Sequence, residues 1–401
     1  MTPLRLTIDM IDKSVSNIDH QLCCGCMMCG DVCPKDAISF PINKGFWYPK
    51  VDDEKCINCG ICRRKCPVLN VNKNRESSDV DYYGVKTKQD EVRWHSTSGG
   101  FFTELAYYII ENNGVVIGAL YDDNNCTVHA IGRNKDDISR LRQSKYAQSN
   151  TNGIYRQVKD LLKQGNLVLF CGTPCQVEAL YAYLGSRPEN LITMDFICLG
   201  ICSPWIFRKY LDMLEANYNS KVQRVWFKNK TNGWRAISNR IDFENGKTYL
   251  RSGKYDLFMR LFVTDALSMR SNCENCKFRS VHHISDFTVG DFWGVEKVNP
   301  KIDDNKGISA LCVNTDRARS IFEQILSQLD YFKTEADAIV KHNFSVLKPM
   351  ITNPSQDLFM DMVERKGLTA AAYKFSTYNR RLEMDRFITN LKSCIRKLLK
   401  K

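Results

Sequence analysis

Two cysteine runs near the N-terminus have the spacing of ligands for iron-sulfur clusters. Each run reads C-x2-C-x2-C-x3-C-P, and the second begins 33 residues after the first. In this arrangement three thiolates of a run bind one [4Fe-4S] cluster, and the fourth, beside the proline, binds the other cluster. We therefore predict two ligand sets: Cys23, Cys26, Cys29 and Cys66 for cluster I, and Cys33, Cys56, Cys59 and Cys62 for cluster II.

Two other uses of cysteine fit this sequence less well. Structural zinc sites group cysteines in pairs and do not require eight of them in this register. Disulfide scaffolds are small secreted domains, whereas this chain has 401 residues and 18 cysteines. Residues 1–20 contain scattered acids and no apolar block of the kind that marks a secretory signal. We therefore expect a cytoplasmic protein whose thiols are reduced or bound to iron.

The overall composition predicts a globular protein with more than one domain. The chain is 43% apolar and 25% charged, and it is longer than one hydrophobic core usually supports. No apolar stretch reaches the roughly 18 residues of a membrane span. The formal charge of +12 suits an acidic redox partner, an acidic membrane surface or nucleic acid. Because the basic residues are spread along the chain rather than grouped in one recognition motif, we do not expect nucleic-acid binding.

Changes in residue pattern divide the chain into four segments. These are a two-cluster ferredoxin-like domain over residues 1–70, a polar linker over 71–81, a larger domain over 82–355 and a helical segment over 356–401. The last segment ends in a basic amphipathic helix over residues 378–401, which either docks on the core or contacts a membrane surface or a partner.

The secondary structure expected within these segments defines the fold class. In the first domain, short strands at 37–40 and 46–51 form a hairpin. The second domain alternates helices at 100–112, 154–163, 176–184 and 204–216 with strands at 115–121, 167–170 and 191–197. Antiparallel hairpins follow over residues 222–250. We therefore predict an α/β protein in which a ferredoxin-like α+β domain precedes a larger mixed α/β domain.

Six further cysteines fall in three short loops and could hold a third cluster. They are Cys171 and Cys175, Cys198 and Cys202, and Cys273 and Cys276. The first two loops each follow a predicted strand, so neighbouring parallel strands would bring their thiols together, and the C-x2-C pair could complete a set of four ligands. The alternative is that these cysteines serve as small buried hydrophobic residues. His282 and His283, close to the third loop, lack metal-ligand spacing, and we expect them at the surface.

Glycine-rich and hydroxyl-rich turns near these loops suggest a nucleotide cofactor. Ser98, Gly99 and Gly100 precede a predicted helix, whose free backbone N-H groups and positive dipole end suit a pyrophosphate. Such a sequence can also merely cap a helix. Further turns of this kind contain Gly172 with Thr173 and Gly290 with Asp291.

Several ordered motifs give the chain a resemblance to a known family. It resembles the coenzyme F420 hydrogenase/dehydrogenase beta-subunit family, in the branch with an N-terminal two-cluster ferredoxin domain, over about residues 20–345. The resemblance rests on Ser98-Gly99-Gly100, Ser144 to Ser149, Gly172 to Gln176, Cys198 before Gly200, Ser203-Pro204, Cys273-x2-Cys276, Asp286 and Gly290 to Gly294.

The resemblance implies FAD beside a third [4Fe-4S] cluster. It implies Cys175, Cys198, Cys273 and Cys276 as ligands of that cluster. It also implies flavin contacts, and with the neighbouring turns the predicted set is Ser98, Gly99, Gly100, Lys145, Tyr146, Gln148, Gly172, Thr173 and Asp291. Many members have His and Pro where this chain has Leu199 and Cys202, so Cys171 and Cys202 remain alternative ligands.

These features predict a flavin-dependent iron-sulfur oxidoreductase. Its clusters would connect an external redox carrier or partner enzyme to FAD, and the FAD would exchange a hydride with coenzyme F420 or another small molecule. Lys145 is the predicted catalytic residue, because its charge would stabilise reduced flavin; the alternative is an exposed lysine with a structural role. The alternative is an electron-transfer protein that feeds a partner enzyme and has no substrate of its own.

Overall fold

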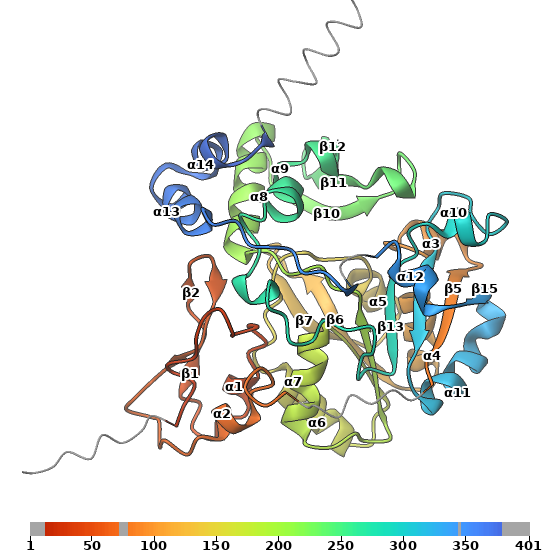
Figure 1. The fold of residues 1–401 in the computed structure, drawn as a ribbon, viewed down its shortest axis with the longest axis horizontal. Coiled ribbons are helices and arrows are strands. Elements are labelled where there is room, and N and C mark those ends of the chain that lie inside the picture. Colours follow the sequence, from red (N-terminus) through yellow and green to blue (C-terminus); the bar gives the residue numbers. More distant parts are fainter. Residues whose placement is uncertain (1–12, 72–78, 344–345, 379–401) are drawn as a thin grey trace, which may run out of the picture.

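The structure is a computed structural model that describes residues 13–71, 79–343 and 346–378. An eight-stranded mixed sheet forms its centre, with helices on both faces, and the N-terminal region lies against one side of this body (Figure 1). The architecture is the predicted α/β fold, with a small ferredoxin-like region followed by a larger mixed α/β region. None of the helices in the described residues is long and apolar enough to cross a membrane.

The N-terminal region contains two short helices and four two-residue strands. The helices are α1 (Met28–Asp31) and α2 (Ile61–Lys65), and the strands are β1 (Ile38–Ser39), β2 (Ile42–Asn43), β3 (Phe46–Trp47) and β4 (Lys50–Val51). Strand β1 pairs with β4, and β2 pairs with β3, both antiparallel. The predicted hairpin is therefore confirmed. Its turn places Lys44 and Gly45 in the left-handed region, with φ of 48° and 80°.

The strand order of the central sheet is β15-β5-β14-β13-β9-β8-β6-β7. The four inner strands β6 (Val115–Tyr121), β8 (Val168–Cys171), β9 (Leu191–Phe196) and β13 (Phe287–Asp291) are parallel. The outer strands β5 (Asp81–Thr87), β7 (Thr127–Gly132), β14 (Ser309–Val313) and β15 (Leu329–Thr334) pair antiparallel. Apolar residues such as Leu169 and Phe170 are fully buried on opposite faces, as parallel strands covered on both sides require.

Helices cover the two faces of the sheet. One face packs against α4 (Phe101–Glu111), α5 (Lys135–Leu141) and α11 (Asp316–Ile325). The other face packs against α6 (Ile154–Lys163) and α7 (Pro174–Leu184), and α8 (Pro204–Tyr218) belongs to the same core cluster. Of these, α4, α6, α7 and α8 are the four helices that the sequence predicts. The remaining short helices are α3 (Asp90–Trp94), α10 (Val295–Val298) and α12 (Ala336–Val340).

A second, three-stranded antiparallel sheet carries the predicted hairpins. It consists of β10 (Val222–Asn229), β11 (Ser238–Phe243) and β12 (Thr248–Ser252). The turn at Asn245-Gly246 is tight, but the connection at Asn232-Gly233 is longer, because a 3-10 turn (Trp234–Ala236) separates the two strands. Helix α9 (Leu257–Met259) and a π-helical turn (Arg260–Thr264) follow.

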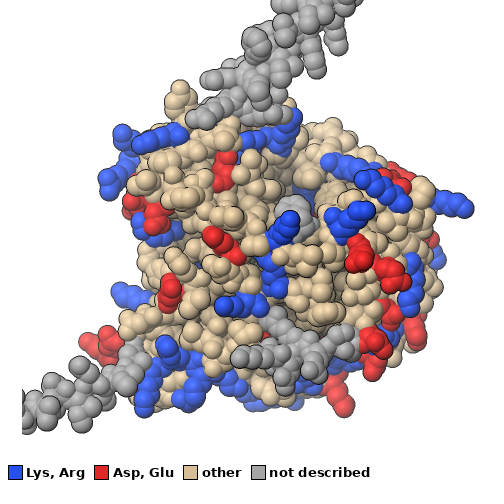
Figure 2. Space-filling model, viewed as in Figure 1, with Lys and Arg blue, Asp and Glu red and all other residues tan. Residues whose placement is uncertain are grey.

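The C-terminal segment shares its core with the rest of the molecule. Helices α13 (Gln356–Lys366) and α14 (Leu368–Phe375) bury Phe359 and Ala371 in the same apolar cluster as the N-terminal region and α8. The helix predicted over residues 378–401 lies outside the described residues except for Tyr378. Figure 2 shows Lys and Arg scattered over the visible face and interspersed with Asp and Glu.

Buried polar contacts fix the N-terminal region against the sheet region. The Asp31 carboxylate accepts hydrogen bonds from the backbone N-H groups of Gly153 (2.6 Å) and Tyr155 (2.9 Å) at the start of α6. The Arg156 guanidinium donates to the carbonyl oxygens of Asp31 (2.7 Å) and Gly30 (2.9 Å). Because the Asp31 side chain is buried, these contacts hold α1 and the cysteine run around it in one position.

Candidate iron-sulfur and cofactor sites

The structure brings together each of the two predicted N-terminal ligand sets. One cavity is lined by the four cysteines predicted for cluster I: Cys23, Cys26, Cys29 and Cys66. A second cavity is lined by the four predicted for cluster II: Cys33, Cys56, Cys59 and Cys62. Each set thus takes its fourth cysteine from the other run, as the spacing predicts. The donor chemistry, four thiols around one cavity, fits a [4Fe-4S] cluster.

Tight turns with positive φ bend the chain around these cavities. Gly25 (φ 69°) and Met27 (φ 59°) lie between the cysteines of the first run, and Asn58 (φ 49°) and Gly60 (φ 71°) occupy equivalent places in the second. Helices α1 and α2 begin directly after these turns. The backbone therefore folds back sharply enough for three cysteines within seven positions to face one point.

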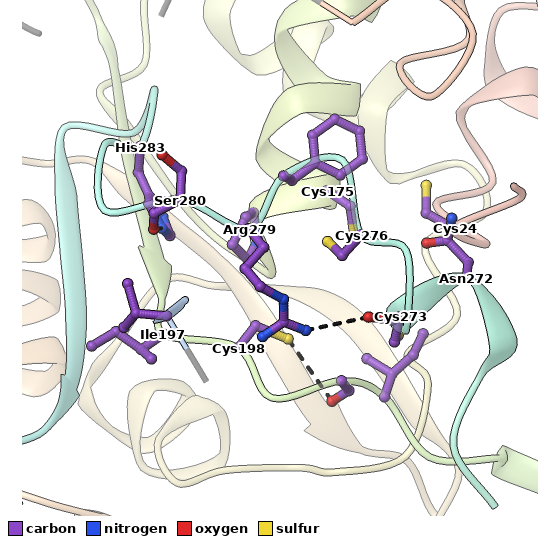
Figure 3. Close-up of a pocket in the computed structure, with 15 residues that line it drawn as sticks. Cys24, Cys175, Ile197, Cys198, Asn272, Cys273, Cys276, Arg279, Ser280 and His283 are labelled. Carbon is purple, nitrogen blue, oxygen red and sulfur yellow. Dashed lines mark hydrogen bonds between the residues drawn. The ribbon is translucent and has the colours of Figure 1, made fainter. Parts of the chain in front are cut away.

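A third cavity lies at the edge of the central sheet and is lined by Cys175, Cys198, Cys273 and Cys276, the four cysteines implied by the resemblance (Figure 3). Cys175 lies in the first turn of α7, where Thr173 and Gln176 form a capping box. Cys198 follows β9, the parallel neighbour of β8. The loop that carries Cys273 and Cys276 closes the set. Among the described residues no three His, Cys, Asp or Glu side chains stand close enough to hold a single metal ion.

Burial controls the protonation of these thiols. It raises the pKa of Cys273 to about 12. The pKa of Cys175 is raised by a hydrogen bond with Cys24 and then by burial. Both thiols are therefore protonated at neutral pH in the absence of a metal, so binding as thiolates releases protons.

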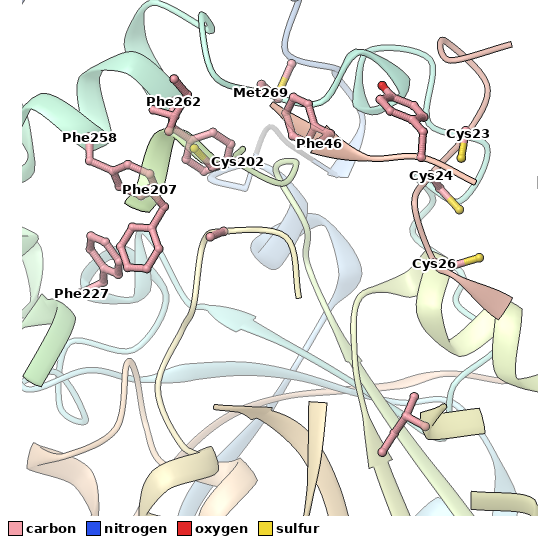
Figure 4. Close-up of a cluster of buried hydrophobic side chains, with 14 of the residues drawn as sticks. Cys23, Cys24, Cys26, Phe46, Cys202, Phe207, Phe227, Phe258, Phe262 and Met269 are labelled. Atoms are coloured by element: carbon pink, nitrogen blue, oxygen red, sulfur yellow. The ribbon is translucent and has the colours of Figure 1, made fainter. Parts of the chain in front are cut away.

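The two alternative ligands, Cys171 and Cys202, do not line the third cavity. Cys202 is fully buried among aromatic side chains (Figure 4), and its Sγ lies 3.1 Å from the Ser268 hydroxyl. Cys171 faces the larger cavity described below, and burial raises the pKa of its thiol to about 12. A different cysteine, Cys24, lines the third cavity in their place.

His283 also lines the third cavity, and the expectation that it lies at the surface is wrong. Its Nδ1 atom lies 2.7 Å from the buried Asp195 carboxylate, and its Nε2 atom lies 2.9 Å from the Ser280 carbonyl oxygen. Sequence spacing could not reveal this position, because Asp195 is on β9, 88 residues away.

A much larger cavity of about 840 Å³ borders the third one. Its size is that of a site for a large organic ligand. Eight of the nine predicted flavin contacts line it: Ser98, Gly100, Lys145, Tyr146, Gln148, Gly172, Thr173 and Asp291. Gly99 does not line the cavity, because its N-H donates to the Ser309 hydroxyl at 2.9 Å and the backbone of Val85 covers its Cα.

The large cavity has a strongly basic lining. Among the described residues, its Lys, Arg, Asp and Glu side chains are six basic ones, Arg142, Lys145, Lys228, Arg235, Lys254 and Arg260, and one acidic one, Asp291. Asp291 is paired with Lys228 and accepts a hydrogen bond from Trp234 Nε1 at 3.2 Å. The Arg142 guanidinium has two buried nitrogen atoms, Nε and Nη1, with no partner among the described residues. These features, with the N-terminus of α4 at the wall, fit an anionic cofactor such as FAD.

The cluster I cavity, the third cavity and the large cavity share lining residues. Cys24, Cys175, Ile197, Cys198, Gly200 and Ile201 line both the third cavity and the large one. Cys24 also lines the cluster I cavity. A row of adjoining sites therefore runs from the cluster I cavity through the third cavity to the large cavity. Because of its lining, the large cavity is named the basic cavity.

Known protein families match two stretches of the chain. Residues 165–338 match the family described as the C terminus of the beta subunit of coenzyme F420 hydrogenase/dehydrogenase. Residues 22–70 match the 4Fe-4S dicluster domain. Residues 165–338 thus form a domain of the F420 hydrogenase/dehydrogenase beta-subunit family, and a 4Fe-4S dicluster domain precedes it. The chain is an iron-sulfur protein related to oxidoreductase subunits.

The names of two relatives of this chain refer to F420. The coenzyme F420-dependent sulfite reductase of Methanocaldococcus jannaschii is 28% identical over 171 residues, or 41% of this chain and 25% of that protein. A subunit of the F(420)H(2) dehydrogenase of Methanosarcina mazei is 22% identical over 202 residues, or 47% of this chain and 57% of that protein. The chain thus spans about a quarter and just over half of the lengths of these relatives.

One solved structure shows a weaker likeness to this chain. A chain of the F420-reducing [NiFe] hydrogenase complex from Methanosarcina barkeri is 16% identical, with a TM-score of 0.43, over 74% of this chain and 92% of that chain. The fold described above therefore rests on its own sheet order and helix packing.

Lys145 makes contacts that could not be predicted from the sequence. Its ammonium donates hydrogen bonds to the carbonyl oxygens of Arg140 (2.9 Å), Leu141 (3.0 Å) and Arg142 (2.6 Å) at the C-terminal end of α5. Burial lowers the pKa of Lys145 to about 7. All three donors of the ammonium are engaged, so the structure lends no support to its predicted catalytic role.

We expect Lys145→Met to destabilise the protein by about 1–3 kcal/mol, since three helix-terminal carbonyl oxygens lose their donor. The thermal unfolding midpoint and the rate of flavin reduction, measured on the same preparation, distinguish the two roles. A lower midpoint with an unchanged rate supports the capping role. A slower rate with an unchanged midpoint would restore the catalytic one.

Proposed function

We propose that this protein is an FAD-dependent iron-sulfur oxidoreductase with three [4Fe-4S] clusters. The observation that supports this best is the continuous row of sites, in which Cys24 lines the cluster I cavity, the third cavity and the basic cavity. Bound FAD would exchange a hydride with a substrate and single electrons with the clusters, which is the chemical reason for such a combination. The three sets of four cysteines would hold the clusters.

The residues of the basic cavity have distinct proposed roles toward FAD. Gly100, in the left-handed region at φ 94°, opens α4 and directs its first N-H groups to the cavity. Arg142 supplies unpaired buried donors for a phosphate. Tyr146 packs edge-on against Phe227 and forms part of the aromatic wall. Ser98 and Gln148 are weaker candidates for flavin contacts, because their side chains already donate hydrogen bonds within the protein. The Ser98 hydroxyl donates to the Ile308 carbonyl oxygen, and the Gln148 amide donates to the Gly25 carbonyl oxygen.

We expect Arg142→Gln to weaken FAD binding by about tenfold to hundredfold, the value of one or two charge-assisted hydrogen bonds. The measurement is a fluorescence titration of flavin-free protein with FAD. Arg140→Gln is the matched control, because Arg140 lies two residues before Arg142, is exposed and does not line the cavity. Equal affinities for the two variants would remove Arg142 from the site.

The proposed substrate is a hydride carrier of the deazaflavin or nicotinamide class. The names of two relatives contain coenzyme F420, and the basic cavity wall suits the phosphate groups of such molecules. Anaerobic protein mixed with reduced coenzyme F420, NADH or NADPH should show the electron paramagnetic resonance (EPR) signals of reduced clusters only when FAD is bound. Clusters that dithionite reduces but none of these donors reduces would contradict the proposal.

The second candidate is an electron-transfer protein without a substrate of its own, which would feed a partner enzyme. It is favoured by the name of one relative, which is a subunit of a dehydrogenase. In either case we propose a redox partner or external carrier that meets the protein on the side of cluster II, in the cytoplasm, where free thiols stay reduced. Purified protein that contains clusters but binds no FAD would favour this second function.

A further inference from the structure

Arg270 is a fully buried arginine at the junction between the N-terminal region and the sheet region. Its Nε donates to the Cys23 carbonyl oxygen at 2.8 Å. Its Nη1 donates to the Trp47 carbonyl oxygen at 3.2 Å and to Gln148 Oε1 at 3.1 Å. The guanidinium also lies over the Tyr48 ring, 4.1 Å from the ring centre.

The charge of Arg270 has no counter-ion among the described side chains. Its Nη2 atom is buried without a hydrogen-bond partner, and no carboxylate in the described part of the chain pairs with it. All of the partners given above are neutral. An unpaired cation in a protein interior is strongly destabilising, so a buried arginine needs negative charge nearby.

The sites that flank Arg270 would supply that negative charge. On one side, Arg270 binds the carbonyl oxygen of Cys23, a predicted ligand of cluster I. On the other side, its own carbonyl oxygen accepts a hydrogen bond from the N-H of Cys273, a predicted ligand of the third cluster. A [4Fe-4S] cluster with four thiolate ligands is an anion, and it becomes more negative when it is reduced.

The Arg270 guanidinium also binds the peptide bond that joins the two sites. Cys23 and Cys24 are consecutive, Cys23 lines the cluster I cavity, and Cys24 lines that cavity and the third one. The carbonyl that Arg270 binds belongs to the peptide bond between these residues. Cys24 is 5% exposed and its thiol is hydrogen-bonded with that of Cys175, so a short bonded path joins the two ligand sets.

We propose that Arg270 is the shared counter-cation of cluster I and the third cluster. It raises the reduction potential of both and fixes the Cys23-Cys24 peptide along which one electron passes between them. In that step one cluster loses the electron and is oxidised, the other gains it and is reduced, and no proton or further reactant is needed. The inference rests on the proposed function, because it requires both clusters.

The first test is an EPR-monitored redox titration of Arg270→Gln. At a fixed potential, the ratio of reduced to oxidised cluster should fall about tenfold for cluster I and for the third cluster, which corresponds to about 59 mV for a one-electron couple. Cluster II is the internal control, because none of its ligands contacts Arg270, and its ratio should stay the same. An equal change at all three clusters, or no change at any, would overturn the proposal.

A second variant tests the charge without altering the arginine. Gln148→Glu places a carboxylate at the 3.1 Å contact with Arg270 and should lower the same two potentials. Arg270→Lys keeps a cation and should shift them less than Arg270→Gln does. Unchanged potentials in Gln148→Glu would contradict the role, even if Arg270→Gln fails to fold.

The iron content of the wild-type protein distinguishes failure of this inference from failure of the proposed function. About twelve iron atoms per chain, with potentials that do not respond to Arg270, would overturn the inference alone. About eight iron atoms would overturn the third cluster and with it the shared role. A potential shift confined to cluster I would then show Arg270 to be the counter-cation of that cluster only.

Discussion

Cys198→Ser should remove about a third of the bound iron, from about twelve to about eight atoms per chain, because a serine oxygen replaces one of the four thiolates of the third cluster. Cys198 is the best of the four positions for this test. The Cys24 thiol lies beside Cys175 and could replace that ligand, whereas Cys198 follows β9 at the opposite wall (Figure 3). The measurement is iron analysis of anaerobically purified protein, with EPR to identify which signal is lost.

Two matched variants serve as controls for the loss of iron. Cys202→Ser changes a fully buried thiol beside Ser268, and Cys171→Ser changes a thiol in the large cavity. Both should keep about twelve iron atoms. If Cys171→Ser lost iron while Cys198→Ser kept it, Cys171 would replace Cys198 among the ligands of the third cluster.

Gly25→Ala should destabilise the protein by about 2–4 kcal/mol and disturb the junction between the N-terminal and sheet regions, because crowding adds about 1–3 kcal/mol and an alanine in the left-handed region about 1 kcal/mol. A methyl group at Gly25, where φ is 69°, would overlap Gln148 Nε2 and lie 2.8 Å from Arg270 Cζ, and both side chains are buried. The thermal unfolding midpoint of cluster-loaded protein and the rate of electron transfer from dithionite to FAD measure the two effects.

Gly165→Ala separates the steric part of this effect from the backbone part. Gly165 has a similar φ of 83°, but no atom lies within 4 Å of an added methyl group. We therefore expect only the backbone cost of about 1 kcal/mol and unchanged electron transfer. Equal losses for Gly25→Ala and Gly165→Ala would show that the junction tolerates the added methyl group.

The sequence predicts the features of this protein that depend on local spacing or on neighbouring strands. The cysteine runs predict two sets of four cysteines, and the structure gathers each set around one cavity, because three members of each set lie within seven positions. Residues 154–163 form one of the helices that the sequence predicts. Cys175 and Cys198 meet because β8 and β9 are adjacent parallel strands, which alternation of helix and strand makes the natural arrangement.

The sequence does not predict contacts that depend on distant segments. Arg270 meets Cys23 across 247 positions, and His283 meets Asp195 across 88. The basic wall of the large cavity gathers side chains from the loop after α5, from β10 and from the π-helical turn, none of which forms a basic motif by itself. The motif around Lys145 indicates a flavin contact, yet its ammonium bonds a helix end only three to five residues away. Such choices depend on packing, which residue spacing does not encode.

The most direct test of the central claim is the iron and released-flavin content of anaerobically purified protein. Three [4Fe-4S] clusters and one flavin site predict about twelve iron atoms and one FAD per chain. About eight iron atoms with no flavin would contradict the account and leave a two-cluster electron carrier joined to a domain whose basic cavity serves another purpose.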